Sequence, residues 1–339
     1  MEVADRIGRT STSLTTAERR VAEVVLANPQ LVAFGTVADL AEGAGSGAAT
    51  VVRLATKLGF EGFSALQMGS AAGREHIIAT LSTIASAVLA VGRPAQVVAG
   101  ITGFADDAER DNLAALFATP LGINCSAVTL CSDMEIAYRD LFAPGDGYLV
   151  YAGTGSIGAF IDTAGKFHRV GGHGGILDDA GSGFWIAIEA LRHIWRAEDE
   201  RPGRWRESAM ATEVFARIGG NDWSASREFL YGGGLEGNRG HIGQLALAVA
   251  AAADDDPVAQ RILAAAGAEL ARLAVTLVAR FGPRPVALSG RVAALHPLIE
   301  QGMRATLPHD LRLEVRMSDA HHAAARIAAK TIHHSRRST

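Results

Sequence analysis

A glycine-rich hairpin near the middle of the chain constrains the fold more than any other feature. The apolar run 148–152 enters Gly153-Thr154-Gly155-Ser156 and leaves through residues 157–161, and a second turn follows at 162–166. Two apolar runs on either side of a tight turn predict a pair of antiparallel strands. The turn exposes backbone amides and two hydroxyls, and such a concave arrangement suits phosphate groups or sugar hydroxyls.

A second glycine-rich segment, residues 171–186, follows the hairpin closely. Its glycines permit the backbone to approach a ligand. Asp179 offers a carboxylate to sugar hydroxyls, and we expect a helix to begin just after it. The Gly-Thr-Gly-Ser tetrapeptide is weak by itself, because glycine turns are common. The neighbouring segment strengthens the interpretation as a ligand-binding site.

The N-terminal part of the chain predicts a bundle of short helices. Thr15 and Glu18 fit a capping box, in which each side chain satisfies the other residue's amide, and this helix should end at Asn28. A third helix is expected over about 48–58, after the glycine-bearing turn 43–47. Two short helices joined by such a turn make a helix-turn-helix, whose second helix enters the major groove of DNA.

The third helix is expected to have an apolar and a polar side. Its inward side comprises Val51, Leu54, Ala55 and Leu58. On the outward side we expect a threonine that contacts a base or a phosphate and an arginine long enough to reach guanine. Further basic side chains suit phosphates, which position a protein without specifying sequence. The candidate DNA contacts are Arg19, Arg20, Ala49, Thr50, Arg53 and Lys57.

The charge of residues 1–67 alone favours another interpretation. Six basic and seven acidic side chains give −1, so composition points to a bundle that binds protein. However, residues 17–22, 49–53 and 57–63 resemble the helix-turn-helix domain of the RpiR/MurR type. The resemblance implies a DNA-binding domain that acts as a dimer on sugar-catabolism promoters. Gly47 stands where that family usually has a serine cap, so one phosphate contact is expected to be missing.

The remainder of the chain predicts an α/β body. The apolar run 77–92 is shorter than the ~20 residues of a membrane span and predicts a buried helix. Asp256 and Pro257 form a helix start. Further strands are expected at 96–103, 127–131, 285–292 and 311–317, and a last helix at 320–330.

This order of elements resembles the BadF/BadG/BcrA/BcrD ATPase family, which includes N-acetylglucosamine kinases of the actin/hexokinase superfamily. The resemblance covers about residues 75–330 and is most specific over 153–186. It implies that Asp133 holds the sugar and serves as general base if the chain is active. The alternative is that Asp133 caps a helix that starts near Met134. The other implied contacts are Thr154 and Asp179 for the sugar, and Gly153, Thr154, Gly155, Ser156, Ser289 and Gly290 for phosphate and nucleotide.

Several departures from that family weigh against phosphoryl transfer. No Asp-Gly-Gly sequence of the kind that forms the first phosphate loop occurs in the chain, and the early strands that carry it have no counterpart. Arg291 replaces the second glycine of the adenosine loop, His173 replaces a tryptophan, and Ala180 replaces an acidic residue. Because phosphoryl transfer depends on positioning and charge neutralisation, these losses should cripple it.

We therefore expect an α/β fold with an N-terminal all-α domain. The expected domains are a helix-turn-helix at 1–67, a truncated first lobe of a ribonuclease H-like kinase fold at 68–152, a second lobe at 153–330 and a disordered tail at 331–339. The favoured function is a transcriptional regulator of amino-sugar metabolism whose degenerate kinase domain senses an effector. The alternatives are an active ATP-dependent amino-sugar kinase, the only case that requires ATP and magnesium, and a decayed kinase that binds nothing.

The remaining expectations concern partners and location. Operator DNA and a sugar or sugar phosphate are the expected ligands, and a homodimer is expected because the truncated lobe would leave a sheet edge uncovered. No metal site is predicted, since adjacent histidines at 321–322 and 333–334 should point to different sides of a helix. Cys125 and Cys131 fit buried or half-buried thiols of a reducing cytoplasm. The N-terminus lacks the basic and apolar regions of a secretion signal.

Overall fold

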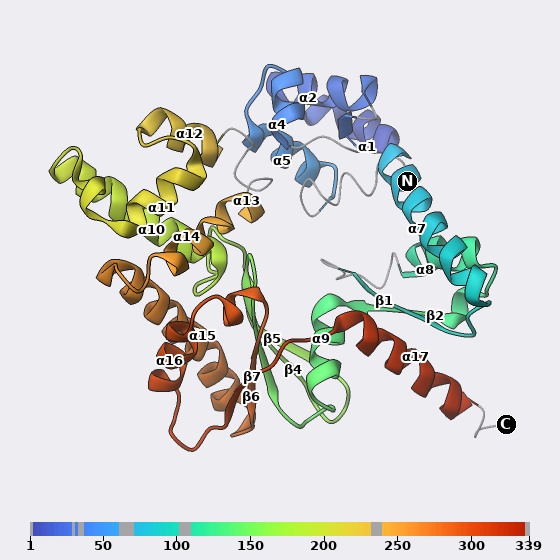
Figure 1. The fold of residues 1–339 in the computed structure, drawn as a ribbon. Coiled ribbons are helices and arrows are strands. Elements are labelled where there is room, and N and C mark those ends of the chain that lie inside the picture. Colours follow the sequence, from blue (N-terminus) through green and yellow to red (C-terminus); the bar gives the residue numbers. More distant parts are fainter. Residues whose placement is uncertain are drawn as a thin grey trace. The chain divides into compact units, whose positions relative to one another are not determined.

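The computed structural model (Figure 1) divides the chain into two compact units. It describes residues 3–28, 31–32, 37–60, 71–101, 110–231 and 239–335. The first unit comprises Met1–Ala95, Asp111–Ala127 and Arg227–Asn238. The second comprises Gln96–Arg110, Val128–Ser226 and Arg239–Thr339. The two helices that follow the N-terminal module along the chain thus group with it, whereas every strand lies in the second unit.

The N-terminal module consists of α1 (Val3–Thr10), α2 (Thr16–Ala27), α4 (Val37–Gly43) and α5 (Ala48–Lys57). Helix α2 begins with the predicted capping box: the Glu18 amide donates to Thr15 Oγ1 at 3.3 Å, and the Thr15 amide donates to Glu18 Oε2 at 2.8 Å. It ends at Ala27 with Asn28 as its C-cap, as predicted. Both ends of α2 are therefore set by local sequence.

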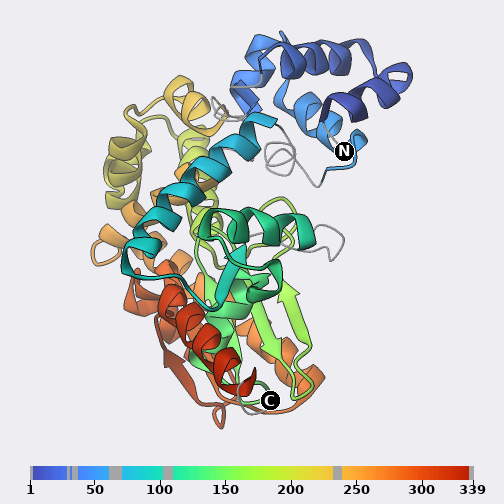
Figure 2. The ribbon, with the colours of Figure 1, turned by 90° about the vertical axis from the view of Figure 1, so that its right-hand side faces the viewer.

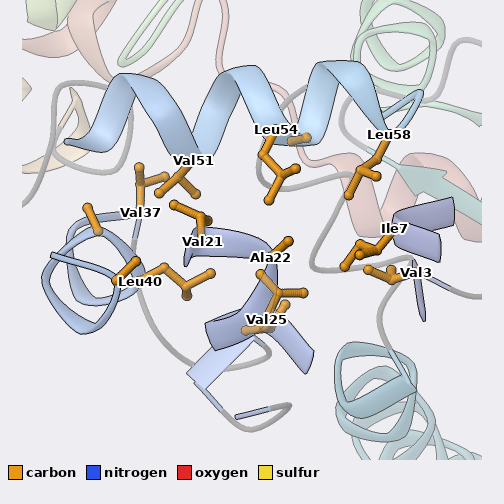
Figure 3. Close-up of a cluster of buried hydrophobic side chains, with 14 of the residues drawn as sticks. Val3, Ile7, Val21, Ala22, Val25, Val37, Leu40, Val51, Leu54 and Leu58 are labelled. Atoms are coloured by element: carbon orange, nitrogen blue, oxygen red, sulfur yellow. The ribbon is translucent and has the colours of Figure 1, made fainter. Parts of the chain in front are cut away.

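The core of this module is one continuous apolar cluster (Figure 3). Val51, Leu54, Ala55 and Leu58 point inward from α5, which confirms the predicted inward side. They meet side chains from α1, α2 and α4. Leu54 is 0% exposed, and truncation of such a leucine to alanine costs roughly 2–5 kcal/mol. This packing fixes the direction of α5 and therefore its exposed side.

Two further helices of the first unit are α7 (Ala71–Val91) and α8 (Arg110–Leu121). The prediction of a helix over 77–92 is confirmed, but the prediction that it is buried is wrong. Ala85 is the one buried side chain among residues 78–91, whereas Ile84 and Val91 are 54% and 94% exposed. Apolar residues occur on every side of α7, so a single packed neighbour cannot cover them all.

The second unit contains a complete mixed sheet in the order β5-β4-β3-β6-β7. Strand β3 pairs antiparallel with β4 and parallel with β6, and Gly158 opposes Val150 in the hairpin. Helix α15 (Pro257–Phe281) covers β3, β4 and β5, while α9 (Asp133–Leu141) packs on the side of β3 and β4 that Figure 1 shows opposite α15. The strands are β3 (Tyr148–Ala152), β4 (Ser156–Ile161), β5 (Phe167–Gly171), β6 (Val286–Ser289) and β7 (Leu313–Val315).

Helix α15 is the one described helix long and apolar enough to cross a membrane. Half of its apolar window is buried, and Leu270, Leu273 and Leu277 are 0% exposed. Its start follows the sequence closely, because Asp256 Oδ1 accepts the amides of Val258 and Ala259 at 2.9 and 3.2 Å. These contacts make α15 the central core helix of the second unit.

A second, smaller sheet contains only β1 (Val97–Ile101) and β2 (Val128–Ser132), which run parallel with Ala99 opposite Leu130. Helix α9 packs against both strands, and α17 (Ala320–Ser335) packs against β1 and α9. Figure 2 shows the second unit from the side on which α17 lies. The expected tail at 331–339 is corrected in part, because helix α17 continues to Ser335; residues 336–339 lie outside the described residues.

The strands predicted at 285–292 and 311–317 are present but shorter. The segment 285–292 forms a strand only to Ser289, because Gly290 turns the chain into a short 3₁₀ helix, Arg291–Ala294. The part of 96–103 beyond Ile101 lies outside the described residues. The strand β5 was not predicted. The remaining helices are α10 (Gly183–Glu200), α11 (Ala209–Ile218), α12 (Trp223–Tyr231), α13 (Arg239–Gly243), α14 (Leu245–Ala251) and α16 (Pro297–Thr306).

Candidate ligand site and DNA-facing helix

The Gly153-Thr154-Gly155-Ser156 turn joins β3 to β4 and is held by the start of α10. The Gly183 amide donates to the Gly153 carbonyl at 2.8 Å, and the Phe184 amide donates to the Thr154 carbonyl at 3.3 Å. Within the turn, the Gly153 amide donates to the Gly155 carbonyl at 2.8 Å. The first amides of α10 thus hold the turn in place, and the turn is preorganised.

Asp179 lies directly against this turn. It is 3% exposed and has φ +58°, a left-handed conformation that is uncommon for a residue other than glycine. The Ser156 amide donates to Asp179 Oδ1 at 3.4 Å, and the Ser156 hydroxyl donates to the Ala180 carbonyl at 2.8 Å. A Cβ atom at Gly155 would lie 2.9 Å from Asp179 Oδ2, so only glycine allows this approach. The two predicted glycine-rich segments therefore do meet.

Sequence reasoning missed Arg239, the first residue of α13. Its Nη2 forms an ion pair with Asp179 Oδ2, and its guanidinium lies 5.6 Å from the centre of the Phe184 ring. The side chain is 30% exposed, yet Nε is buried and has no hydrogen-bond partner. Arg239 is distant from Asp179 in the chain and belongs to no motif, so only the fold could reveal it.

A second arginine holds the neighbouring aspartate. Arg272 of α15 donates from Nη2 to Asp178 Oδ1 at 3.0 Å. The helix after these aspartates begins at Gly183, a little later than expected, with the Ser182 hydroxyl accepting the Trp185 amide at 3.2 Å. Asp178 and Asp179 are thus each paired with a cation from a different helix.

The predicted nucleotide-binding residues Ser289 and Gly290 lie next to the turn, but not as expected. Gly290 has φ +93°, and a Cβ atom there would collide with the carbonyl of Ala152 at the end of β3. Ser289 is 0% exposed, and its hydroxyl accepts the Ser318 amide at 3.3 Å. The Ser289 side chain therefore joins the end of β6 to the segment that follows β7.

Asp133 follows β2 and is the first residue of α9. The alternative in which Asp133 caps this helix is wrong, because Ser132 is the N-cap: its hydroxyl accepts the Glu135 amide at 3.1 Å. Asp133 is half-buried, and its Oδ1 accepts the Met134 amide at 2.9 Å. None of these contacts joins Asp133 to the Gly153–Ser156 turn, so its role as sugar ligand remains a prediction.

On the first unit, α5 exposes Ala49 and Arg53 as predicted. Thr50 was predicted to face outward, but it is 6% exposed, so that placement is wrong. Its hydroxyl accepts a hydrogen bond from Arg53 Nη2 at 3.1 Å. Gly47 is the N-cap of α5 and supplies no side-chain cap. The Thr50 hydroxyl therefore fixes the direction of the Arg53 side chain.

Lys57, predicted as a phosphate contact, is exposed and also pairs with Glu18 of α2, so its contact with DNA stays a prediction. Its Nζ lies 2.7 Å from Glu18 Oε2, and Glu18 is 2% exposed. The hydrogen bond from Lys57 and that from the Thr15 amide lower the pKa of Glu18 from 4.5 to about 2. Arg19 and Arg20 are exposed, as a phosphate contact requires.

The histidines at the start of α17 were considered as metal ligands in the sequence analysis. His321 and His322 were expected to point apart, but their Nδ1 atoms lie 2.8 and 2.7 Å from the Asp319 carboxylate. All three side chains are exposed, and they lie at the N-terminus of α17, where the helix dipole opposes a cation.

Cys125 was expected to be at least half-buried, but it is exposed.

The chain matches two family models. Residues 1–72 match the helix-turn-helix domain of the rpiR family, and residues 37–306 match the BadF/BadG/BcrA/BcrD ATPase family. A N-acetylmuramic acid/N-acetylglucosamine kinase of Clostridium acetobutylicum is 35% identical over 74 residues, 22% of this chain and 24% of the relative. A helix-turn-helix-type transcriptional regulator of Haemophilus influenzae is 35% identical over 66 residues, 20% of this chain and 23% of the relative. The chain thus spans about a quarter of these relatives.

Solved structures support the fold of the body. A candidate N-acetylglucosamine kinase from Porphyromonas gingivalis has TM-score 0.58 and 17% identity, with 74% of this chain and 81% of that chain covered. A second, from Chromobacterium violaceum, has TM-score 0.51 and 23% identity, with 74% and 87% covered. The sheet order, the glycine turn and these matches agree on an actin/hexokinase-like fold. The chain is a member of the BadF/BadG/BcrA/BcrD ATPase family that carries an rpiR-type helix-turn-helix domain at its N-terminal end.

Proposed function

We propose that this chain is a DNA-binding regulator of amino-sugar metabolism, in which the kinase-like body binds a sugar effector and does not transfer phosphate. The main observation in support of the proposal is that the two sheets differ in their number of strands. Among the described residues one sheet has five strands and the other has two. The resemblance to the family implies that further strands of the smaller sheet carry the first phosphate loop, and no Asp-Gly-Gly sequence of that kind occurs in the chain.

The details of the remaining half also support a binding role. Phosphoryl transfer requires charge neutralisation on both sides of the phosphates, together with a metal anchor. The Gly153–Ser156 turn is intact and preorganised, but Ser289 is buried and Arg291 follows Gly290. A sugar can be held by such a partial site, since binding requires fewer aligned groups than transfer of a phosphoryl group.

The DNA-reading role is proposed for the exposed side of α5. Arg53 is exposed and oriented by Thr50, a geometry that suits a fork onto guanine. Ala49 beside it leaves room for close approach to base edges. Arg19 and Arg20 of α2 supply phosphate contacts. We further propose a cytoplasmic homodimer, with the exposed apolar side chains of α7 as part of the covered surface.

The second candidate is an ATP-dependent N-acetylglucosamine or glucosamine kinase that retains its DNA-binding domain. The intact turn and the similarity to a curated protein of that activity favour it. It requires ATP and magnesium as cofactors, whereas the regulator requires neither. Asp133 would then serve as general base.

Thermal shift with the full-length protein separates the two candidates. We expect stabilisation by an amino sugar or its 6-phosphate without ATP, and no ADP formation with magnesium, ATP and sugar. Electrophoretic mobility shift with DNA from the promoter adjoining the gene should show a complex that the same sugar alters. Rapid, magnesium-dependent phosphorylation of the sugar would overturn the regulator proposal and establish the kinase.

A further inference from the structure

The side chain available to a ligand beside the glycine turn is Arg239, not Asp179. Asp179 is 3% exposed, with Oδ1 accepting the Ser156 amide and Oδ2 paired with Arg239. The Arg239 side chain is 30% exposed, so part of it reaches solvent. A ligand that approaches from this side meets a cation first.

The surroundings of Arg239 hold it in one orientation. Its guanidinium lies 5.6 Å from the centre of the Phe184 ring, and a Cβ atom at Gly175 would lie 3.2 Å from Nε. The buried Nε has no hydrogen-bond partner in the structure. A guanidinium has five N–H donors in a planar fork. The pair with Asp179 therefore leaves donors for a second acceptor.

A second acceptor for Arg239 would have to come from a ligand, because the nearby carboxylates are already paired with cations. Asp179 is paired with Arg239, and Asp178 is paired with Arg272, so both carboxylates already have cationic partners. The residue next to Asp179 is Ala180, which adds no charge. No further carboxylate is recorded against Arg239 among the described residues. The adjoining turn presents backbone amides, which also favour negative charge.

We propose that this site recognises a sugar that carries an anionic group, either a phosphate or a carboxylate, and that Arg239 donates to that group. Asp179 acts as a positioning residue, because it fixes the guanidinium and braces the turn. The hydroxyls of the sugar would lie against the turn at Gly153–Ser156. The proposal rests on the proposed sensor function and names the chemical class of its effector.

The test is isothermal titration of the full-length protein, without nucleotide, with three ligands of one sugar series. N-acetylglucosamine is neutral, N-acetylglucosamine 6-phosphate carries a phosphate, and N-acetylmuramic acid carries a carboxylate. We expect at least one anionic ligand to bind tenfold or more tightly than the neutral sugar. The two anionic arms show which group the site takes.

The variants assign the preference to Arg239. Arg239→Ala leaves a buried carboxylate unpaired, so the double variant Arg239→Ala with Asp179→Asn is used, because it removes both charges and the Asn oxygen can still accept the Ser156 amide. This double variant should lose the preference of tenfold or more, and Arg239→Lys should retain part of it. Arg261→Ala, an exposed arginine on α15, is the matched control and should leave the preference unchanged.

The outcomes distinguish the proposed anionic ligand class from the sensor function on which it rests. A neutral sugar that binds as tightly as both anionic ones overturns the anionic class and leaves the sensor intact. An anion preference that survives in the double variant removes Arg239 from the site. If none of the three sugars binds to the wild-type protein, the proposed sensor function itself fails for this series, and the anionic class fails with it.

Discussion

The Glu18–Lys57 pair should be the principal polar support of the helix-turn-helix module. Glu18 closes the capping box of α2 and pairs with Lys57 at the end of α5, so one carboxylate joins both helices. Glu18→Gln preserves the shape and the ability to cap but removes the charge. The side chain of Lys57 is then left without its ionic partner.

The size of the effect follows from the pKa of Glu18, which is lowered from 4.5 to about 2. At ~1.36 kcal/mol per unit, this shift corresponds to an upper limit of ~3 kcal/mol. Solvent screens the pair because Lys57 is 39% exposed, so we expect about 1–2 kcal/mol. Because the folded pKa is lowered, this stability is complete above pH 4.5 and is lost as the pH falls towards 2.

Hydrogen–deuterium exchange of the full-length protein measures the stability of α2 and α5 separately from the rest of the chain. The protection of peptides from α2 and α5 should fall about tenfold in Glu18→Gln at pH 7, since ~1.4 kcal/mol is a tenfold change in an opening equilibrium. Glu23→Gln, on the exposed side of the same helix, is the matched control and should change little. Equal protection in the two variants would refute the reasoning, as would wild-type protection, corrected for intrinsic rate, that is unchanged between pH 7 and pH 3.

Three further outcomes test the remaining assignments. Thr50→Val should leave the module folded but weaken DNA binding several-fold by releasing Arg53, as a mobility-shift titration would detect; unchanged affinity would contradict the orienting role. Gly290→Ala should destabilise the second unit by more than ~2 kcal/mol in urea unfolding, whereas Gly165→Ala, also left-handed but with open space, should cost ~1 kcal/mol; similar losses would contradict the close approach. Ile84→Glu on α7 should dissociate the expected dimer in light scattering, and a monomeric wild type would remove that expectation.

The N-terminal module could be predicted from sequence because local rules govern it. The capping box at Thr15, the end of α2 at Asn28 and the inward side of α5 depend on neighbours three or four residues away. The hairpin around Gly153 was predicted for the same reason, since an apolar run, a glycine turn and a second apolar run are contiguous. These features can be predicted without knowledge of the tertiary structure.

The errors occur where a partner is distant in the sequence. Thr50 looks like a surface residue of α5 in the sequence, but it is 6% exposed, and the pairing of Lys57 with Glu18 of α2 was not foreseen. Arg239 could not be found, because its partner Asp179 lies on a different segment and no spacing rule relates them. The exposure of α7 was misjudged because an apolar composition does not state whether a covering layer exists.

The two parts of the candidate site should depend differently on the smaller sheet, which bears on the proposed change from kinase to receptor. The Gly153–Ser156 turn is stabilised by its own hairpin and by the first amides of α10, all within the complete sheet. Loss of strands from the other sheet therefore leaves the turn in place. A nucleotide clamp has no such independence, because it requires groups from both lobes in register. If the proposed function is right, loss of strands from the smaller sheet should abolish transfer, while the turn and Arg239, held in place by Asp179, keep their geometry.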